Sequence, residues 1–280
     1  MSKRCLICNA DSADIILNNI AMEKCERCGF IWQKNFNLKA SHYNNLEVDL
    51  SKEKLDAREK NCQDRVNLFK KYIDLNNLCD IGTGEGIFLK VLKAKGYKNI
   101  CGIEPSKIGQ DYAEKNNLRV ICGFINDFPE IKRKYHIKVI TLFHVIEHLV
   151  NPKESLGLIY QNMEIGDHLI IETPNINAFS FKNLNYHHHL IYPEHFFYFN
   201  EENLRKLLID INYKIIANGR RDFNQNYLNM SDILLRWGLL KNSKYIKFFN
   251  KFNKKFLVYL PSKLIQILGR LDYQWVIVKK

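Results

Sequence analysis

From residue 76 to the carboxyl terminus, short apolar runs alternate with stretches whose apolar residues recur at helical spacing. The apolar runs predict strands at residues 77–81, 99–103, 118–122, 137–143 and 168–172, and the other stretches predict helices at 86–95, 106–116, 152–163 and 201–210. Such alternation is typical of an α/β protein with a parallel sheet covered by helices on both faces. We expect a sixth strand at 213–216 and a last, antiparallel strand at 272–280.

The remaining segments divide the chain into predicted units. Residues 1–40 are expected to form a small metal-binding module. Residues 41–75 are expected to form a helical cap or linker, because 51–75 has helical spacing and Ser51 is an acceptable N-cap. The α/β domain then occupies residues 76–280, with a helical insertion at about 222–270.

Two cysteine pairs lie near the amino terminus. Cys5 and Cys8 are followed by 16 intervening residues and then by Cys25 and Cys28, a pattern typical of tetrahedral zinc sites. Four thiolates leave no open coordination position, so we predict a structural zinc ion; disulfides and coincidence are the alternatives. Short β-prone stretches around the pairs indicate a zinc ribbon. Such ribbons often bind nucleic acid, but we favour a scaffold or lid role.

A glycine-rich turn follows the first predicted strand. Asp80 precedes Gly82, Gly84 and Gly86, and these glycines permit close approach of the backbone to a ligand. The G-x-G-x-G spacing differs from the dinucleotide fingerprint, and the Gly-Lys-Ser/Thr of a phosphate loop is absent from the sequence. Glu104 ends the second predicted strand, 18 residues after Gly86. A carboxylate there can accept hydrogen bonds from both ribose hydroxyls of a nucleoside.

Several motifs carry a family resemblance. The turn from Asp80 to Gly86 resembles motif I of the class I S-adenosylmethionine (SAM)-dependent methyltransferases. Residues 143–148 are similar to the His-Val-Leu-Glu-His segment of many small-molecule and sugar methyltransferases. Residues 186–200 resemble a Glu-His-Phe-x-Tyr-Phe segment in a family that includes zinc-containing nucleotide-sugar C-methyltransferases. The resemblance covers about residues 1–216 and implies a Rossmann-like seven-stranded methyltransferase sheet with a small N-terminal zinc-binding module.

The resemblance also implies which residues contact SAM. In these enzymes the glycine turn and its acidic residue hold the methionyl part, and the region after the third strand contacts the adenine. The implied cofactor-binding residues are Asp80, Gly82, Gly84, Gly86, Glu104, Asp127, Phe143 and His144. For Asp127, a solvated acid in a turn is an alternative interpretation.

The chemistry constrains the catalytic candidates. Methyl transfer from a sulfonium is an in-line displacement, so alignment and exclusion of water are the enzyme's main contributions. A hydroxyl acceptor must also lose a proton, for which histidine is suited. The candidates implied by the resemblance are Tyr43, His148, Glu194 and His195. Alternatively, Glu147 and His148 only brace the turn after the strand.

Charge and hydropathy bear on partners and location. The net charge of +12 arises from basic residues spread along the chain, which favours compositional bias over a nucleic-acid surface. Within residues 244–256, aromatic residues and lysines fall on different faces of a predicted helix. This helix is expected to pack on its own domain or to contact an anionic membrane peripherally. No apolar stretch approaches the roughly 18 residues of a membrane span, and no signal peptide precedes the first cysteines, so we expect a cytoplasmic protein.

The sequence therefore predicts a SAM-dependent methyltransferase that acts on a sugar or another small polar acceptor. A nucleotide-linked or lipid-linked glycan precursor is the favoured acceptor, with methylation at oxygen favoured over carbon. The alternative is a nucleic-acid-binding protein or an RNA methyltransferase that uses the ribbon and the basic helix. The ribbon shows no interleaved aromatic and basic residues, which weakens that alternative.

Overall fold

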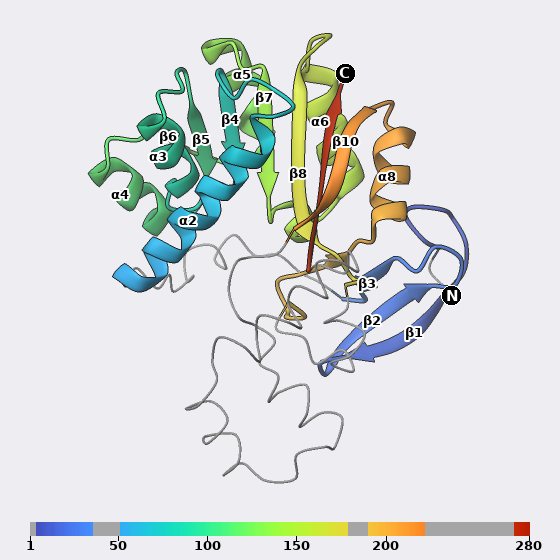
Figure 1. Cartoon of the computed structure of the whole chain (residues 1–280). Coiled ribbons are helices and arrows are strands. Elements are labelled where there is room, and N and C mark those ends of the chain that lie inside the picture. The colour runs from blue at the N-terminus through green and yellow to red at the C-terminus, as the bar shows by residue number, and fades with distance from the viewer. Residues whose placement is uncertain (1–3, 36–50, 179–189, 222–271) are drawn as a thin grey trace, which may run out of the picture.

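The computed structural model describes residues 4–35, 51–178, 190–221 and 272–280. Its main feature is a seven-stranded sheet with the strand order β10-β11-β8-β7-β4-β5-β6 (Figure 1). The strands are β4 (Leu78–Ile81), β5 (Cys101–Glu104), β6 (Val120–Cys122), β7 (Val139–Phe143), β8 (His168–Pro174), β10 (Lys214–Arg221) and β11 (Tyr273–Lys279). Strands β4 to β8 pair in parallel, whereas β11 is antiparallel to both β8 and β10. The prediction of an α/β, Rossmann-like seven-stranded sheet is thus confirmed.

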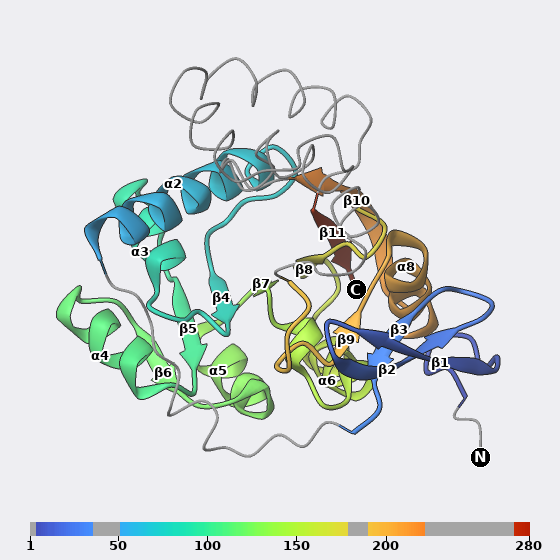
Figure 2. The ribbon, with the colours of Figure 1, turned by 90° about the horizontal axis from the view of Figure 1, so that it is seen from below.

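Helices cover both faces of this sheet, as the view from below shows (Figure 2). The helices are α2 (Lys52–Phe69), α3 (Ile87–Ala94), α4 (Lys107–Lys115), α5 (Phe128–Tyr135), α6 (Pro152–Asn162) and α8 (Glu201–Asp210). Residues of α2 and α3 share one buried cluster with Ile170 of β8, whereas α5, α6 and α8 share the other with Leu169 and Ile171. Ile170 belongs to one cluster and its two neighbours to the other because successive side chains of a strand point to opposite faces of the sheet.

Two elements differ from the sequence-based expectation. Helix α5 was not predicted, because its apolar residues Phe128, Ile131 and Tyr135 flank a basic run and are too few to define a helical face. Helix α2 ends at Phe69, although helical spacing continues to residue 75. After Phe69 the chain turns, and the buried Leu75 leads into β4.

The amino-terminal residues form a second, smaller sheet with the order β1-β2-β3-β9. Its strands are β1 (Ser12–Leu17), β2 (Ile20–Cys25), β3 (Ile31–Gln33) and β9 (Phe197–Tyr198). Strand β9 belongs to the segment before α8, and it pairs with β3 through Ile31 opposite Tyr198 and Trp32 opposite Phe197. Sequence reasoning missed β9, because its pairing partner lies far away along the chain.

Aromatic packing joins the small sheet to the large domain. The ring of Phe30 lies 5.6 Å from Trp32, 5.9 Å from Phe197 and 5.1 Å from Phe199 between centroids. All four residues belong to the same buried cluster as Leu204 and Leu207 of α8. The amino-terminal module and the large α/β domain therefore share one continuous core.

None of the helices in the described part of the chain combines the length and hydropathy needed to cross a bilayer.

Candidate active site

The turn between β4 and α3 presents backbone rather than side chains at the carboxyl end of the sheet. Gly82, Gly84 and Gly86 have φ angles of +71°, +56° and +74°, in the left-handed region that favours glycine. A Cβ atom on Gly82 would also lie 2.5 Å from Val145 Cγ2, so no side chain fits there. Ligands of open α/β sheets bind at this end of the strands. The turn is therefore placed and shaped for close contact with a cofactor.

The carboxylate of Glu104 lies directly against this turn. Glu104 is buried at the end of β5; Oε2 accepts a 2.8 Å hydrogen bond from Gly84 N, and Oε1 accepts one of 2.8 Å from Ser106 N. Gly109 of α4 approaches the same place so closely that a Cβ atom on it would lie 2.6 Å from Gly84 O. The structure thus brings together the glycine turn and the acidic residue that the sequence suggested for the ribose.

Asp80 lies inside the sheet rather than on its rim. It is buried in β4, and Oδ1 accepts a hydrogen bond of 2.5 Å from Thr141 Oγ1 of β7. Burial raises the pKa of Asp80 to about 6, against the effect of the Thr141 bond. The side chain therefore links the two central strands next to the glycine turn.

Asp127 and Phe143, two further residues suggested for the cofactor, have different surroundings. Asp127 is exposed after β6, where Oδ2 accepts a 2.8 Å hydrogen bond from Phe124 N. This contact lies within the turn itself. Phe143 is buried at the end of β7, where its ring centroid lies 5.7 Å from Phe69 and 5.0 Å from Phe88.

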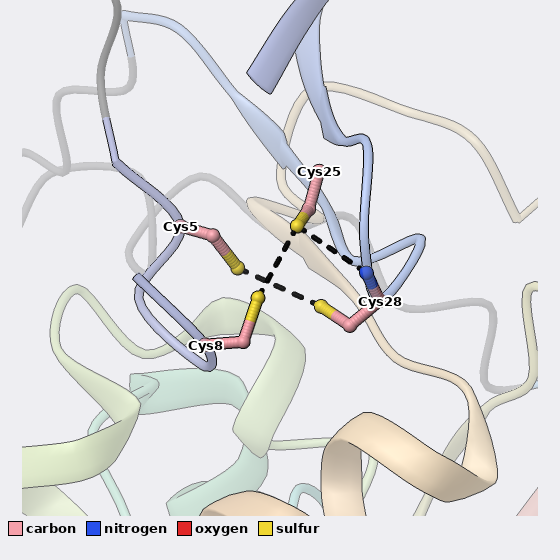
Figure 3. Close-up of side chains that lie close together, drawn as sticks. All are labelled: Cys5, Cys8, Cys25 and Cys28. Atoms are coloured by element: carbon pink, nitrogen blue, oxygen red, sulfur yellow. Dashed lines mark hydrogen bonds between the residues drawn. The ribbon is translucent and has the colours of Figure 1, made fainter. Parts of the chain in front are cut away.

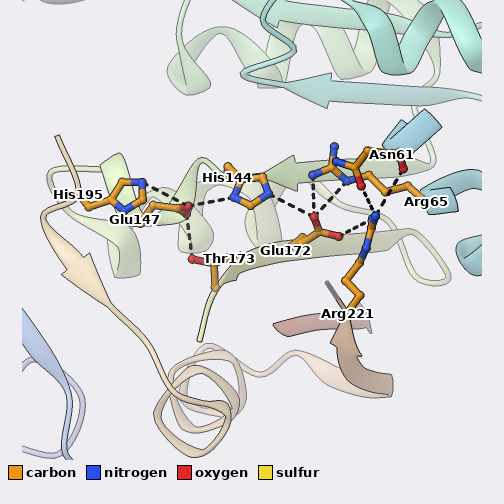
Figure 4. A network of polar contacts seen from close by, with 8 residues as sticks. All are labelled: Asn61, Arg65, His144, Glu147, Glu172, Thr173, His195 and Arg221. Carbon is orange, nitrogen blue, oxygen red and sulfur yellow. Dashed lines mark hydrogen bonds and ion pairs between the residues drawn. The ribbon is translucent and has the colours of Figure 1, made fainter. Parts of the chain in front are cut away.

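A chain of charged side chains runs along the carboxyl ends of β7 and β8 (Figure 4). His144 has Nε2 3.2 Å from Glu172 Oε1 and Nδ1 3.5 Å from Glu147 Oε1. Burial lowers the pKa of His144, but its contacts with Glu147 and Glu172 outweigh burial and raise that pKa above the usual value. His144 therefore links the two buried carboxylates.

Glu172 receives two guanidinium groups at the other end of this chain. Arg65 Nη2 of α2 donates to Oε1 at 2.6 Å, and Arg221 Nη1 of β10 donates to Oε2 at 3.0 Å. Burial opposes ionisation, but the charges of Arg65 and Arg221 hold the pKa of Glu172 well below its usual range. The carboxylate thus ties α2 and β10 to the end of β8.

Glu147 lies in the short helix η2 (Ile146–His148) and is fully buried. Its Oε2 atom accepts a 2.9 Å hydrogen bond from Thr173 Oγ1 of β8. Burial raises the pKa of Glu147, but its interactions with the neighbouring histidines, chiefly His144, outweigh burial and lower that pKa to about 2. A full negative charge is therefore held at this point in the interior.

His195 comes from the segment before β9 and is 2% exposed. Its Nδ1 atom lies 2.8 Å from Leu190 O, and its Nε2 atom lies 3.9 Å from Glu147 Oε1. Burial lowers the pKa of His195 to about 3, so the ring is neutral at pH 7. Its neighbours include the rings of Tyr192 and His148, with centroids 3.9 Å and 4.7 Å away.

His148 and Glu194 meet through the backbone. Nδ1 of His148 lies 2.7 Å from the carbonyl oxygen of Glu194, whereas Glu194 itself is exposed. The structure therefore brings His148 and His195 together, with Glu194 beside them. The fourth catalytic candidate, Tyr43, lies outside the described residues, as does the predicted basic helix within 244–256.

Sequence reasoning missed part of this site. Arg65, Glu172 and Arg221 had no assigned role, and Glu147 had only the role of a brace. No local signal identifies the first three as partners, because Arg65 is 107 residues and Arg221 is 49 residues from Glu172. Only for Glu147 did its position between His144 and His148 offer a hint.

The amino-terminal cysteines form a separate cluster (Figure 3). The four sulfur atoms of Cys5, Cys8, Cys25 and Cys28 all lie within 4.8 Å of one another, with Cys5 3.7 Å from Cys28 and Cys8 3.4 Å from Cys25. A tetrahedron with zinc–sulfur bonds of about 2.3 Å has edges of about 3.8 Å. Since all four cysteines are free thiols at these distances, the cluster fits a zinc ion.

The two cysteine turns are built alike. Asn9 N donates to Cys5 O, and Gly29 N donates to Cys25 O, at 2.9 and 3.1 Å. Asn9 and Gly29 both have positive φ angles, of +57° and +69°. Backbone amides also approach one sulfur of each pair at 3.4 Å, which stabilises thiolate ligands. The backbone thus supports the two cysteine pairs in equivalent ways.

Comparison with known proteins identifies the family. Residues 54–218 match a family model described as a methyltransferase domain, which is more than half of the 280-residue chain. The chain belongs to this methyltransferase-domain family. It is a SAM-dependent methyltransferase. No curated protein matches the sequence.

Solved structures resemble this methyltransferase in fold. One is a SAM-dependent methyltransferase from Archaeoglobus fulgidus, with 18% identity and a TM-score of 0.54 over 81% of this chain and 97% of that chain. Another is phosphoethanolamine N-methyltransferase 2 from Haemonchus contortus in complex with SAM, with 14% identity and a TM-score of 0.52 over 96% of this chain and 71% of that chain. At these identities the likeness concerns the fold alone.

Proposed function

We propose that this methyltransferase transfers the methyl group of SAM to a hydroxyl group of a sugar or another small polar molecule, such as a nucleotide-linked or lipid-linked glycan precursor. The observation that carries the proposal is the juxtaposition of Glu147, His148 and His195 at the carboxyl edge of the sheet. Carboxylate and imidazole groups accept hydrogen bonds from hydroxyl groups. A site lined by apolar side chains would not.

The reaction we propose is an in-line displacement. The bond between the acceptor oxygen and the methyl carbon forms while the carbon–sulfur bond breaks, and its electron pair stays on sulfur. The glycine turn and Glu104 hold the cofactor, while the side chains on η2 and before β9 orient the acceptor. The hydroxyl proton must also leave, and we propose that the carboxylate and imidazole groups at this edge of the sheet promote its departure.

The amino-terminal cluster serves this site in our proposal as a structural zinc centre. Cys25 ends β2, Cys28 lies between β2 and β3, and β3 pairs with β9. His195 lies two residues before β9, and Gln33 Nε2 of β3 donates to its carbonyl oxygen at 3.1 Å. A rigid cysteine cluster therefore fixes the strand that positions His195. This favours the scaffold role over nucleic-acid binding for the module.

A direct test is a screen of nucleotide sugars and other polyhydroxylated acceptors with methyl-labelled SAM, followed by location of the label in the product. We expect label on an oxygen atom of a sugar-containing acceptor. Label on carbon or nitrogen, or transfer only to RNA, would contradict the proposal.

A further inference from the structure

Three potential metal ligands converge beside the charged chain. Glu147, His148 and His195 each offer one donor atom, and these atoms all lie within 4.8 Å of one another. The cluster is distinct from the four cysteines, and its donors are two imidazole nitrogens and a carboxylate oxygen. This donor set is typical of sites for divalent transition-metal ions, which keep open positions for water or substrate.

Backbone carbonyls fix both imidazole rings. His195 Nδ1 lies 2.8 Å from Leu190 O, and His148 Nδ1 lies 2.7 Å from Glu194 O. A carbonyl oxygen only accepts, so Nδ1 carries the hydrogen in each ring, and in the neutral ring Nε2 keeps its lone pair. Histidines that bind metals in proteins are commonly oriented in this way, by a carbonyl that accepts from the other ring nitrogen.

The carboxylate has an oxygen available for a ligand. Oε2 of Glu147 is occupied by Thr173, whereas Oε1 is buried and makes no hydrogen bond within the described residues. Leaving a buried carboxylate oxygen without a hydrogen bond is costly. Its nearest ring nitrogens are Nδ1 of His144 at 3.5 Å and Nε2 of His195 at 3.9 Å. Nε2 of His195 and Oε1 of Glu147 thus face each other across 3.9 Å, and a cation between them would bind both atoms.

We propose that Glu147, His148 and His195 form a second metal site, which binds a divalent transition-metal ion such as Mn²⁺ next to the acceptor. The ion would complete its coordination with water or with the acceptor hydroxyl. Thr173 supports the site from outside by donating to Oε2 of Glu147, which leaves Oε1 for the ion.

The role of this site rests on the function proposed above. A bound divalent ion lowers the pKa of a hydroxyl that coordinates it. The hydroxyl then loses its proton to solvent, its oxygen forms the bond to the methyl carbon, and the carbon–sulfur electron pair neutralises the sulfonium.

Binding of Mn²⁺ tests the site without any acceptor. The full-length protein is first saturated with Zn²⁺ at the cysteines and freed of excess metal, then titrated with Mn²⁺ while electron paramagnetic resonance measures the free ion. We expect one Mn²⁺ per chain. The variants Glu147→Gln and His148→Gln are each expected to weaken Mn²⁺ binding at least about tenfold. His136→Asn, a change of an exposed histidine in another part of the fold, should bind like the wild type.

The outcomes separate the two proposals. Absence of Mn²⁺ binding, or equal binding by all variants, overturns the metal site. Circular dichroism must show that each variant is folded. Because His148 is only partly buried, His148→Gln remains a valid test if Glu147→Gln misfolds. S-adenosylhomocysteine binding, measured by calorimetry on the same samples, reports on the cofactor site independently. A protein that binds Mn²⁺ but methylates no hydroxyl acceptor would retain the metal site and refute the proposed function.

Discussion

Nε2 of His195 lies 3.9 Å from Oε1 of Glu147, and the two side chains are 2% and 0% exposed. One residue comes from the turn after β7, and the other from the segment that joins the amino-terminal module. This contact therefore connects the cofactor-binding sheet with the small sheet that carries the cysteine cluster.

We expect the wild-type protein to bind S-adenosylhomocysteine with a dissociation constant in the micromolar range or below. Glu104→Ala should weaken binding by about 100-fold or more, because two hydrogen bonds from ribose hydroxyls to a carboxylate contribute about 3 kcal/mol together. Isothermal titration calorimetry measures the effect. Glu130→Ala, at an exposed residue of α5, is the matched control. Unchanged binding by Glu104→Ala would contradict the assignment of the cofactor site.

Glu172→Gln should destabilise the fold by about 3–5 kcal/mol, because it leaves Arg65 and Arg221 buried without their counter-charge. The free energy of unfolding can be measured by urea titration. The control is Glu201→Gln, which breaks an ion pair with Arg220. The side chains of Glu201 and Arg220 are 33% and 30% exposed, so this change should cost less than about 1 kcal/mol. Equal effects of the two changes would show that burial of the Glu172 charge is unimportant.

His195 predicts a specific dependence of stability on pH. Its pKa is about 3 in the folded protein because of burial, whereas a histidine in an unfolded chain has a pKa of about 6.5. Between these values the unfolded state binds more protons, so the free energy of unfolding falls as pH decreases. The contribution of His195 is at most about 1.4 kcal/mol per pH unit below about pH 6.5.

In His195→Gln this contribution disappears, so the decline in unfolding free energy between pH 7 and pH 5 should be shallower than in the wild type. The slope is the quantity to compare, since the substitution also changes packing against Tyr192. His144, whose raised pKa acts with the opposite sign, is present in both proteins. The control is His136→Asn, at an exposed histidine. An identical slope in wild type and His195→Gln would show that His195 is not held neutral.

Cys25→Ser should abolish binding of the one zinc ion per chain that we expect, measured by release to a colorimetric chelator. Methyl transfer should fall strongly, because loss of the cluster removes support from β3 and hence from β9 and His195. S-adenosylhomocysteine binding should be retained, since the glycine turn and Glu104 lie on β4 and β5. Cys122→Ser, at an exposed cysteine outside the cluster, should change neither property. Normal zinc content in Cys25→Ser would refute the metal centre.

The sequence by itself determined the features that depend on short stretches of chain. Alternating apolar runs and helical stretches sufficed to predict the strands of the large sheet and most of its helices, because side-chain periodicity follows directly from local backbone conformation. The glycine spacing after Asp80 and the cysteine spacing were likewise local signals. The likeness of Asp80–Gly86 to a cofactor turn led to the methyltransferase family that the comparisons then showed.

Only the tertiary structure decided which distant groups meet. Phe197–Tyr198 joins the sheet of the amino-terminal module, Glu172 lies between Arg65 and Arg221, and Glu147 faces His195. Local periodicity specifies the face on which a residue lies but not its partner across the fold. The partners are fixed where strand ends converge, since burial of a charge is tolerated only where an opposite charge or a hydrogen bond is brought to it.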